Sequence, residues 1–396
     1  MEIAMEIVKW ENWPHVDRMQ DLYQEALMAI IRHSATFAQA MMEDRSLKPI
    51  RLSSVHRRNR DNEKVQRQVR TLFYQPSSRT EGTFETAAQL LGCSRHHVRD
   101  PKTQSSAAKG ESFELAIMAY TTAGGLKHLR GCDCVIIRHD EEGMSTRARK
   151  FLEIALKADG HRKIPLPIIN AGDGCKGQHP SQTVVDFTTM YLQRGCDPNF
   201  LDGMNILFSG ELHRNRTVNS QLYGLGKFAE TAKIKATFCC PADARPDVDM
   251  LGYLSRHRVQ YEFRLPSEFR DSIPQATVIY MTRPQDEYKD SNGQRAKKDP
   301  AVIAQERQQL RFRAEYLNIM AKDAFLMHPL PINEDPNNPP PEIDSELNPM
   351  AMAGDRRLVY PLQSHFGLPV RAAWLDMIFA GLDSEADEIY GRKSAS

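Results

Sequence analysis

Short apolar runs alternate with longer amphipathic segments along most of this chain. The runs are rich in Ile, Val, Phe and Leu and do not alternate with polar residues, a pattern typical of strands buried on both faces. They cover residues 71–74, 134–137, 166–169, 206–208, 236–239, 278–281 and 325–327. The strand–helix alternation predicts an α/β fold with parallel sheets flanked by helices. Residues 1–65 lack such runs and are predicted to be helical, with a basic stretch over 51–60.

Polar and charged side chains follow directly after five of these runs. They are Ser77, Ser78, Arg79 and Thr80 after the first run, Arg138 and His139 after the second, Asn170 to His179 after the third, Thr282 and Arg283 after the sixth, and His328 after the last. Ligands of open parallel sheets bind at the carboxyl ends of the strands. The repeated arginine and histidine at these positions indicate a site for an anionic ligand.

Length and charge limit the class of protein. A chain of 396 residues is long enough for two domains, each with its own core. The formal net charge of +1 gives no global attraction to nucleic acid or to a membrane surface. No apolar run approaches the roughly 20 residues of a membrane span, and the N-terminus does not resemble a secretory signal. We therefore expect a cytoplasmic protein with neither nucleic acid nor a membrane as partner.

The seven cysteines do not form a recognisable metal or disulfide pattern. Their number is odd and several lie in predicted strands, so reduced thiols are expected. Cys132 and Cys134, or Cys93 with the neighbouring His96 and His97, could each be half of a zinc site. Because no second half follows in the sequence, no metal site is predicted.

The segment Ser77–Ser78–Arg79–Thr80 lies between a predicted strand and a predicted helix. The helix would bury Phe84, Ala87, Ala88 and Leu91, which lie on one face. Hydroxyl groups at a helix N-terminus sit beside free backbone N–H groups and the positive end of the helix dipole, and an arginine adds a fork suited to phosphate. The alternative is a simple helix N-cap, which needs only one hydroxyl.

Several motifs together resemble those of the aspartate and ornithine carbamoyltransferase family. In chain order they are Phe73 to Thr80 with Phe84 to Ala87, Ser105 with Lys109 to Glu111, Ile137 to His139 with Glu142 and Gly143, Asn170 to Gly174 with His179 to Thr183, Gly210 with Arg216 to Val218, Tyr280 to Gln285, and His328 to Pro331. The resemblance extends from about Thr71 to Leu375. Seven motifs in the family's order are highly specific, although each alone would be weak.

The resemblance implies transfer of the carbamoyl group of carbamoyl phosphate to the amine of L-aspartate, without a cofactor. It implies two α/β domains with the active site in the cleft between them. Residues 1–183, completed by a C-terminal helix over 368–396, would bind carbamoyl phosphate, and residues 184–367 would bind the amino acid. It also implies a homotrimer in which Ser105 and Lys109 reach into a neighbouring subunit's site.

Individual roles follow position by position from the resemblance. Carbamoyl phosphate would be held by Ser77, Ser78, Arg79, Thr80, Ser105, Lys109, Arg138, His179, Gln182, Pro329 and Leu330. Aspartate would be held by Lys109, Arg216, Thr217, Arg283, Gln285, Leu330 and Pro331. Catalysis would rest on Arg79, Thr80, Arg138 and His179. The two substrates together carry roughly four negative charges, which must be balanced on desolvation; Arg79, Lys109, Arg138, Arg216 and Arg283 are the candidate cations.

Glu81 is the main departure, because the family usually has an arginine there. A carboxylate about 4 Å from phosphate would cost ~4 kcal/mol at an effective dielectric of 20. We therefore expect Glu81 to point away into an ion pair. Three alternatives remain open: an ornithine enzyme, a paralogue acting on another amine, and an inactive scaffold. Residues 1–65, 286–309 and 336–355 look extended relative to the family core.

Overall fold

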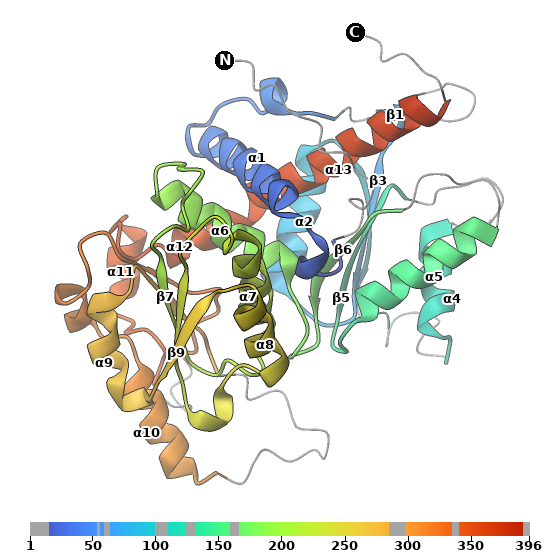
Figure 1. Ribbon diagram of the computed structural model, residues 1–396. Helices are drawn as coiled ribbons and strands as arrows, with labels where there is room; N and C mark the ends of the chain where they lie inside the picture. Colours follow the sequence, from blue (N-terminus) through green and yellow to red (C-terminus); the bar gives the residue numbers. More distant parts are fainter. Residues whose placement is uncertain are drawn as a thin grey trace. The chain divides into compact units, whose positions relative to one another are not determined.

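The computed structural model describes residues 16–53, 56–58, 64–99, 101, 110–122, 132–158, 166–284, 298–334 and 340–390. The chain divides into two compact units, which we call unit 1 (1–188 with 366–396) and unit 2 (189–365). Each contains a parallel sheet with helices around it (Figure 1), so the predicted α/β fold is confirmed. The assignment of one substrate to each unit stays a prediction.

The unit 1 sheet has four parallel strands in the order β4-β3-β5-β6. They are β3 (Gln68–Phe73), β4 (Ser94–Arg99), β5 (Cys134–His139) and β6 (Ile168–Asp173). β5 and β6 are buried along their whole length, which explains why apolar runs identified them. β4 was not predicted: it is an edge strand with the polar sequence Ser-Arg-His-His-Val-Arg, and a strand paired on one side can carry polar residues.

Helices cover the unit 1 sheet. They are α1 (Gln24–Met42), α2 (Ser78–Leu90), α4 (Phe113–Thr122), α5 (Met144–Ala158), α6 (Pro180–Gln193) and α13 (Gly367–Tyr390), with short 3-10 turns at Met19–Asp21 and Lys48–Ile50. The C-terminal helix α13 packs against α1 and α2 (Figure 1). Apolar residues of β3, β5 and β6, including Leu72, Val135 and Ile168, form a core with Ile117 of α4 and Leu152 of α5.

One expectation for the first 65 residues was wrong. α1 is helical as predicted, but β1 (His56–Arg58) and β2 (Lys64–Gln66) form an antiparallel pair. The three-residue strands are too short for a sequence period to be recognised, because a two-residue alternation needs at least four positions.

The unit 2 sheet has five parallel strands in the order β11-β10-β7-β8-β9. They are β7 (Asn205–Ser209), β8 (Lys235–Cys239), β9 (Gln260–Arg264), β10 (Val278–Met281) and β11 (Phe325–Met327). The predicted runs at 278–281 and 325–327 coincide with β10 and β11. β9 was missed because it is a partly exposed edge strand. Leu207, Ile279 and Leu326 of the strands pack with Phe269 and Phe312 in the unit 2 core.

The unit 2 helices are α7 (Arg216–Phe228), α8 (Val248–Arg256), α9 (Phe269–Ser272), α10 (Pro300–Leu310), α11 (Leu347–Met352) and α12 (Tyr360–His365). Short 3-10 turns lie at Ala242–Ala244, Pro266–Glu268, Ile273–Gln275 and Ala314–Asn318. α10 occupies the end of the charged 286–309 region, which looked extended relative to the family core. The part of that region before residue 298, and residues 335–339 of the proline-rich stretch, lie outside the described residues.

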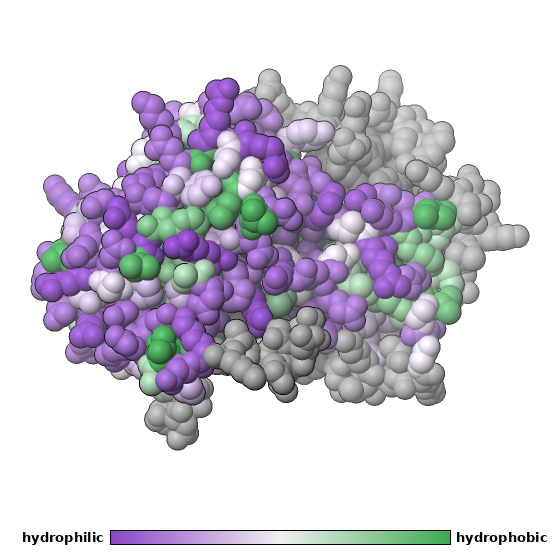
Figure 2. Space-filling model, turned by 60° about the horizontal axis from the view of Figure 1, so that its bottom comes forward, coloured by the Kyte–Doolittle hydropathy of each residue, from purple (hydrophilic) through white to green (hydrophobic). Residues whose placement is uncertain are grey.

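The described part of the chain contains neither a disulfide nor a long apolar helix. Among the described helices, none combines the length and apolar composition that a bilayer span requires. The face in Figure 2 is mainly hydrophilic, with apolar side chains in small groups, which is normal for a folded protein. All seven cysteines are free, as predicted. Burial raises the pKa of the Cys93 and Cys240 thiols to about 12, so both are protonated at neutral pH.

Candidate active site

Three predicted segments of unit 1 follow three neighbouring strands. Ser77–Thr80 follow β3, Arg138 lies at the end of β5, and His179 follows β6. β3 pairs with β5 and β5 pairs with β6, all in parallel. The carboxyl ends of these strands therefore meet at one edge of the sheet, where ligands of parallel sheets bind.

The start of α2 leaves groups available for an anion. Ser77 is the N-cap residue, but its side chain makes no capping hydrogen bond. A purely structural N-cap would use that hydroxyl. Ser78 and Arg79 are exposed, whereas Thr80 is buried. The hydroxyls, the free N–H groups of the first turn and the Arg79 guanidinium form an arrangement suited to phosphate.

His179 connects the β6 segment to α2. Its side chain is buried, and its Nε2 lies 3.5 Å from Oγ1 of Thr80. Its Nδ1 lies 3.3 Å from Oγ of Ser181. The backbone N–H of Gln182 donates to the His179 carbonyl at 2.9 Å, and Gln182 Nε2 donates to Asp186 Oδ1 at 2.9 Å. Thr80 and His179, which are 99 residues apart in the chain, are thus neighbours in the fold.

Arg138 is held by the strand beside it. Only 8% of Arg138 is exposed, and Nη1 donates to the carbonyl of Ala171 in β6 at 3.0 Å. Asn170 maintains this part of β6, because its Oδ1 accepts from Gly172 N at 2.7 Å and its Nδ2 donates to the Asp17 carbonyl at 3.0 Å. A buried guanidinium in a fixed position is suited to a ligand anion.

Glu81 points into an ion pair, as the sequence favoured. Its Oε1 lies 3.2 Å from Nε2 of His97 on β4. The other ring nitrogen, Nδ1, lies 3.1 Å from Glu85 Oε1 and 2.6 Å from Thr71 Oγ1. His97 therefore bridges two carboxylates that lie one helical turn apart. Glu81 was the strongest sequence argument for an inactive homologue, and this pairing weakens it.

Glu81, Glu85 and His97 form a group, among the described residues, that could hold a metal ion by distance alone. Their potential ligand atoms all lie within 4.8 Å of one another. However, the two nitrogens of His97 face different carboxylates. A metal ligand offers one nitrogen while the other makes a supporting contact. The imidazole lies between the two carboxylates with a nitrogen toward each, and this geometry does not support a metal site.

Replacing Glu81 by Gln is expected to leave the Kd of carbamoyl phosphate within about threefold of the wild type, because the carboxylate contacts His97 instead of the anion site. Calorimetric titration measures this. Glu85→Gln, which removes the other carboxylate from the same imidazole, is the matched control. Tightening of more than about tenfold, specific to Glu81→Gln, would show that the carboxylate opposes the bound phosphate.

In unit 2, Arg216 and Thr217 begin helix α7. The N-cap residue Asn215 accepts from the backbone N–H groups of Thr217 and Val218 at 3.2 Å each. Its Oδ1 also accepts from the Thr217 hydroxyl at 2.6 Å. The predicted ligand group Thr217 therefore already contributes its proton to the cap and could only accept from a ligand. Arg216 is half-buried at the positive end of the helix.

Arg283 follows β10 and is half-buried, with Nη1 donating to the carbonyl of Pro284 at 3.0 Å. The preceding Thr282 is bonded to β7, since its N–H and hydroxyl both donate to the Ser209 carbonyl at 2.9 Å. Gly210, which follows Ser209 of β7, must be glycine, because a Cβ at this position would lie 2.5 Å from the Thr282 carbonyl oxygen. The loops after β7 and β10 are thereby held side by side.

The segment Pro329–Leu330–Pro331 follows β11 and turns back through His328. The Leu330 N–H donates to His328 Nδ1 at 2.8 Å, and the His328 N–H donates to Gln363 Oε1 at 2.9 Å. Leu330 has a positive φ of 54°, and the Leu330–Pro331 bond is cis. β11, β10 and β7 are neighbours in the sheet, so the three predicted segments of unit 2 also end at one edge.

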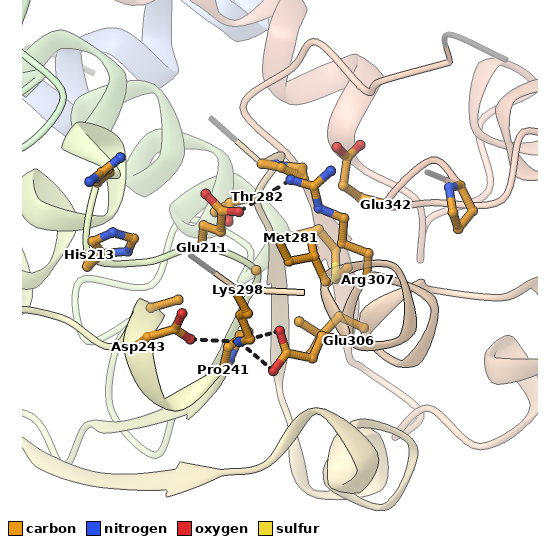
Figure 3. Close-up of a pocket in the computed structure, with 17 residues that line it drawn as sticks. Glu211, His213, Pro241, Asp243, Met281, Thr282, Lys298, Glu306, Arg307 and Glu342 are labelled. Atoms are coloured by element: carbon orange, nitrogen blue, oxygen red, sulfur yellow. Dashed lines mark hydrogen bonds and ion pairs between the residues drawn. The ribbon is translucent and has the colours of Figure 1, made fainter. Parts of the chain in front are cut away.

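A pocket of about 260 Å³ lies at this edge of unit 2. Its walls come from the loops after β7, β8 and β10 and from α10. Figure 3 shows Lys298 between Asp243 and Glu306, with its Nζ 2.9 Å and 2.6 Å from their carboxylates. Arg307 lies 3.4 Å from Glu211. Of the predicted aspartate-binding residues that the structure describes, none lines the pocket, although Thr282 and Pro284 on either side of Arg283 do.

Glu342 was not predicted and lies in this pocket wall. Only 8% of it is exposed, and its Oε2 accepts from the Asn333 N–H at 3.0 Å. Burial raises its pKa, while the charges of Arg283 and Arg307 oppose that rise. The proline-rich sequence around it gave no periodic signal. Three predicted site residues, Ser105, Lys109 and Gln285, lie outside the described residues and stay predictions.

The chain is similar to known proteins over most of its length. The family described as aspartate/ornithine carbamoyltransferase matches with its carbamoyl-P binding domain at residues 15–192 and its Asp/Orn binding domain at 202–378. A chloroplastic aspartate carbamoyltransferase 2 of Pisum sativum is 31% identical over 341 residues, covering 83% of this chain and 76% of that protein. The aspartate carbamoyltransferase catalytic subunit of Methanocaldococcus jannaschii is 28% identical over 372 residues, covering 94% and 99%.

Solved structures agree with the sequence matches. The catalytic subunit of M. jannaschii aspartate transcarbamoylase aligns with a TM-score of 0.68 at 27% identity, covering 95% of this chain and 99% of that chain. A Trypanosoma cruzi aspartate transcarbamoylase in complex with carbamoyl phosphate shares the fold, with a TM-score of 0.67 at 22% identity and coverage of 92% and 95%. With its motifs, its two sheets and these relatives in agreement, the chain belongs to the aspartate/ornithine carbamoyltransferase family.

Proposed function

We propose that this protein transfers the carbamoyl group of carbamoyl phosphate to the amine of L-aspartate, a reaction of pyrimidine biosynthesis. The products are N-carbamoyl-L-aspartate and phosphate. The observation that carries the proposal is the grouping of Thr80, His179 and Arg138 beside the start of α2 in unit 1. These groups match the two ends of carbamoyl phosphate, a phosphate and a carbonyl oxygen.

In this proposal the phosphate lies at the N-terminus of α2, on the Ser77 and Ser78 hydroxyls and the Arg79 guanidinium. The carbonyl oxygen faces Thr80, His179 and Arg138. The amine nitrogen of aspartate attacks the carbonyl carbon, forming a C–N bond and a tetrahedral intermediate. The C–O bond to phosphate then breaks, phosphate leaves with the electron pair, and the amine proton passes to the departing phosphate. Each donor placed at the developing oxyanion is worth about 2.7–4 kcal/mol.

Unit 2 supplies the groups for aspartate. Arg216 and Arg283 would each bind a carboxylate, because a guanidinium fork matches the two oxygens of that group. Arg216 adds the positive end of α7. Backbone groups of Leu330 and Pro331 would complete the site, with Lys109 and Gln285 added from outside the described residues. Binding both substrates in one orientation supplies much of the rate acceleration.

We further propose a cytoplasmic homotrimer, in which Ser105 and Lys109 of one subunit complete the site of its neighbour. The support is the family resemblance of the Ser105 to Glu111 segment. With two substrates that carry roughly four negative charges, a cation from a neighbouring subunit would balance charge that Arg79 and Arg138 leave uncompensated.

The proposed function is tested by measuring phosphate release from carbamoyl phosphate with a panel of amines. Aspartate is expected to support turnover, and asparagine, ornithine and putrescine are expected to be at least about a hundredfold poorer, because asparagine and ornithine each leave one arginine without a carboxylate and putrescine leaves both. Equal turnover with ornithine or asparagine would favour a paralogue with another acceptor. No release with any amine, from protein that binds carbamoyl phosphate, would favour an inactive homologue.

A further inference from the structure

We infer that Arg371, a residue of the C-terminal helix α13, is a positioning residue that holds the carbamoyl phosphate site of unit 1 in its binding geometry. The inference deepens the proposed function and rests on it. Neither the sequence motifs nor the roles implied by the family resemblance included this residue. Its contacts reach helix α2, whose first turn we expect to touch the phosphate of carbamoyl phosphate.

Arg371 acts first on helix α2. Its Nη1 donates to Oγ1 of Thr83 at 2.6 Å, and its guanidinium carbon lies 5.1 Å from the centre of the Phe84 ring. The Thr83 hydroxyl in turn donates to the carbonyls of Arg79 at 2.7 Å and Thr80 at 3.2 Å. The arginine is therefore one hydroxyl away from the backbone of the two residues at the centre of the predicted phosphate motif.

The donors and acceptors of this chain are consistent. A threonine hydroxyl has one proton and can accept as well as donate. The guanidinium can only donate, so Thr83 accepts from Arg371 and gives its own proton to the α2 carbonyls. The direction of each hydrogen bond from Arg371 through Thr83 to the α2 carbonyls is thus determined. A valine at position 83 would keep the shape of the side chain and remove these hydrogen bonds.

The charge of Arg371 is also felt by Asp186 in helix α6, the helix that follows His179. Asp186, which is fully buried, is the carboxylate whose charge favours the protonated guanidinium. The same carboxylate accepts from Gln182 Nε2 at 2.9 Å, and the Gln182 backbone is bonded to His179. Arg371 therefore holds α2 by direct contact, and the charge of Asp186, which binds Gln182, is the electrostatic link to the His179–Gln182 segment.

Burying the Arg371 guanidinium removes a charge from water, which costs free energy of folding. Only 3% of Arg371 is exposed, and burial lowers its pKa to about 9, with Asp186 opposing the shift. The guanidinium remains largely protonated at neutral pH. Apolar residues of similar volume often stabilise a core as well as a buried ion pair does. A charged side chain in this position therefore indicates a contribution to the site beyond packing.

Gly367 makes room for the guanidinium. Nη1 of Arg371 donates to the Gly367 carbonyl at 3.2 Å, and a Cβ at position 367 would lie 2.6 Å from that Nη1. The backbone conformation at position 367 is open to any residue, because its φ is not positive. A side chain there is disfavoured only because its Cβ would clash with Arg371. Gly367→Ala adds a single methyl group and would consequently displace the Arg371 guanidinium.

Unit 1 contains a matched control in Arg67. Only 1% of Arg67 is exposed, its guanidinium carbon lies 4.8 Å from the Phe379 ring of the same helix α13, and it is paired with Asp383. Its guanidinium donates to the Phe379 carbonyl and the Asp383 carboxylate, both in the later part of α13. Arg67→Met thus removes a buried guanidinium, a ring contact and an ion pair, all made to the later part of α13.

The test compares Arg371→Met, Arg371→Lys, Thr83→Val, Gly367→Ala and Arg67→Met in the full chain. Titration calorimetry gives Kd for carbamoyl phosphate and for inorganic phosphate, and steady-state kinetics gives kcat and the aspartate KM at saturating carbamoyl phosphate. Arg371→Met is expected to weaken carbamoyl phosphate binding about tenfold or more and to lower kcat, with the aspartate KM changed less than about threefold. Arg371→Lys restores the charge without the fork, so only partial recovery is expected.

Thr83→Val and Gly367→Ala are expected to reproduce the weakened binding in smaller measure, and Arg67→Met to leave Kd within about twofold even where it lowers the unfolding temperature. If Arg371→Met does not fold, Thr83→Val and Gly367→Ala decide the question. Unchanged carbamoyl phosphate binding in both, or equal weakening in Arg67→Met, would overturn the positioning role. A wild-type protein that binds carbamoyl phosphate but transfers it to no amine would instead overturn the proposed function and leave this inference standing.

Discussion

Replacing Arg79 by alanine is expected to lower kcat/KM for carbamoyl phosphate about a thousandfold, the largest effect of any single exposed side chain in unit 1. Arg79 lies in the first turn of α2 beside free N–H groups, so its charge and the helix dipole act on the same anion. Its side chain is exposed. The loss is therefore expected to be functional, with the free energy of unfolding changed by less than about 0.5 kcal/mol.

The measurement is steady-state phosphate release together with thermal unfolding. Arg45→Ala, which removes another exposed arginine of unit 1 that pairs with Glu43, is the control and is expected to keep full activity. The proposed trimer adds a second readout. Arg79→Ala and Lys109→Ala are each expected to be nearly inactive, and subunit exchange between them to restore part of the activity. Activity retained by Arg79→Ala would remove the phosphate role of α2, and no recovery despite exchange would count against shared sites.

The second large effect is expected for Arg283→Lys, which should raise the aspartate KM about a hundredfold and leave the Kd of carbamoyl phosphate within about twofold. Lysine keeps the positive charge but cannot make two parallel bonds to one carboxylate. Arg283 is half-buried, and Glu342 lies close enough for the two charges to interact. A shorter ammonium group at this position would be drawn to that carboxylate instead of to the substrate.

Initial-rate kinetics with aspartate as the varied substrate tests this, with Arg256→Lys as the control, because Arg256 is an exposed arginine at the end of α8 in the same unit. A proportional loss in kcat with unchanged KM would mean that Arg283 acts on the transition state and does not hold aspartate in the ground state. No change in either constant would remove Arg283 from the aspartate site, and the acceptor would have to be sought again.

Local sequence patterns determined the buried strands and the fold class. A strand with helices on both faces is apolar at every position, so runs such as 278–281 and 325–327 have one interpretation, and the structure places β10 and β11 at those residues. The runs also located the chemistry, because a polar residue directly after a buried strand lies at the ligand-binding edge. Arg138 and Arg283 were found by that rule before any contact was known.

Edge strands and long-range contacts were decided only by the tertiary structure. β4 and β9 have polar sequences because one side of each is unpaired, and short β1 and β2 have no usable period. The orientation of Glu81 depends on His97, which β4 brings to α2. Arg371 reaches Thr83 across 288 positions of sequence, and Glu342 reaches the charges of Arg283 and Arg307 from a proline-rich stretch. Sequence periodicity reports which face of an element is buried, whereas the partner on that face is selected by packing and electrostatics between segments far apart in the chain.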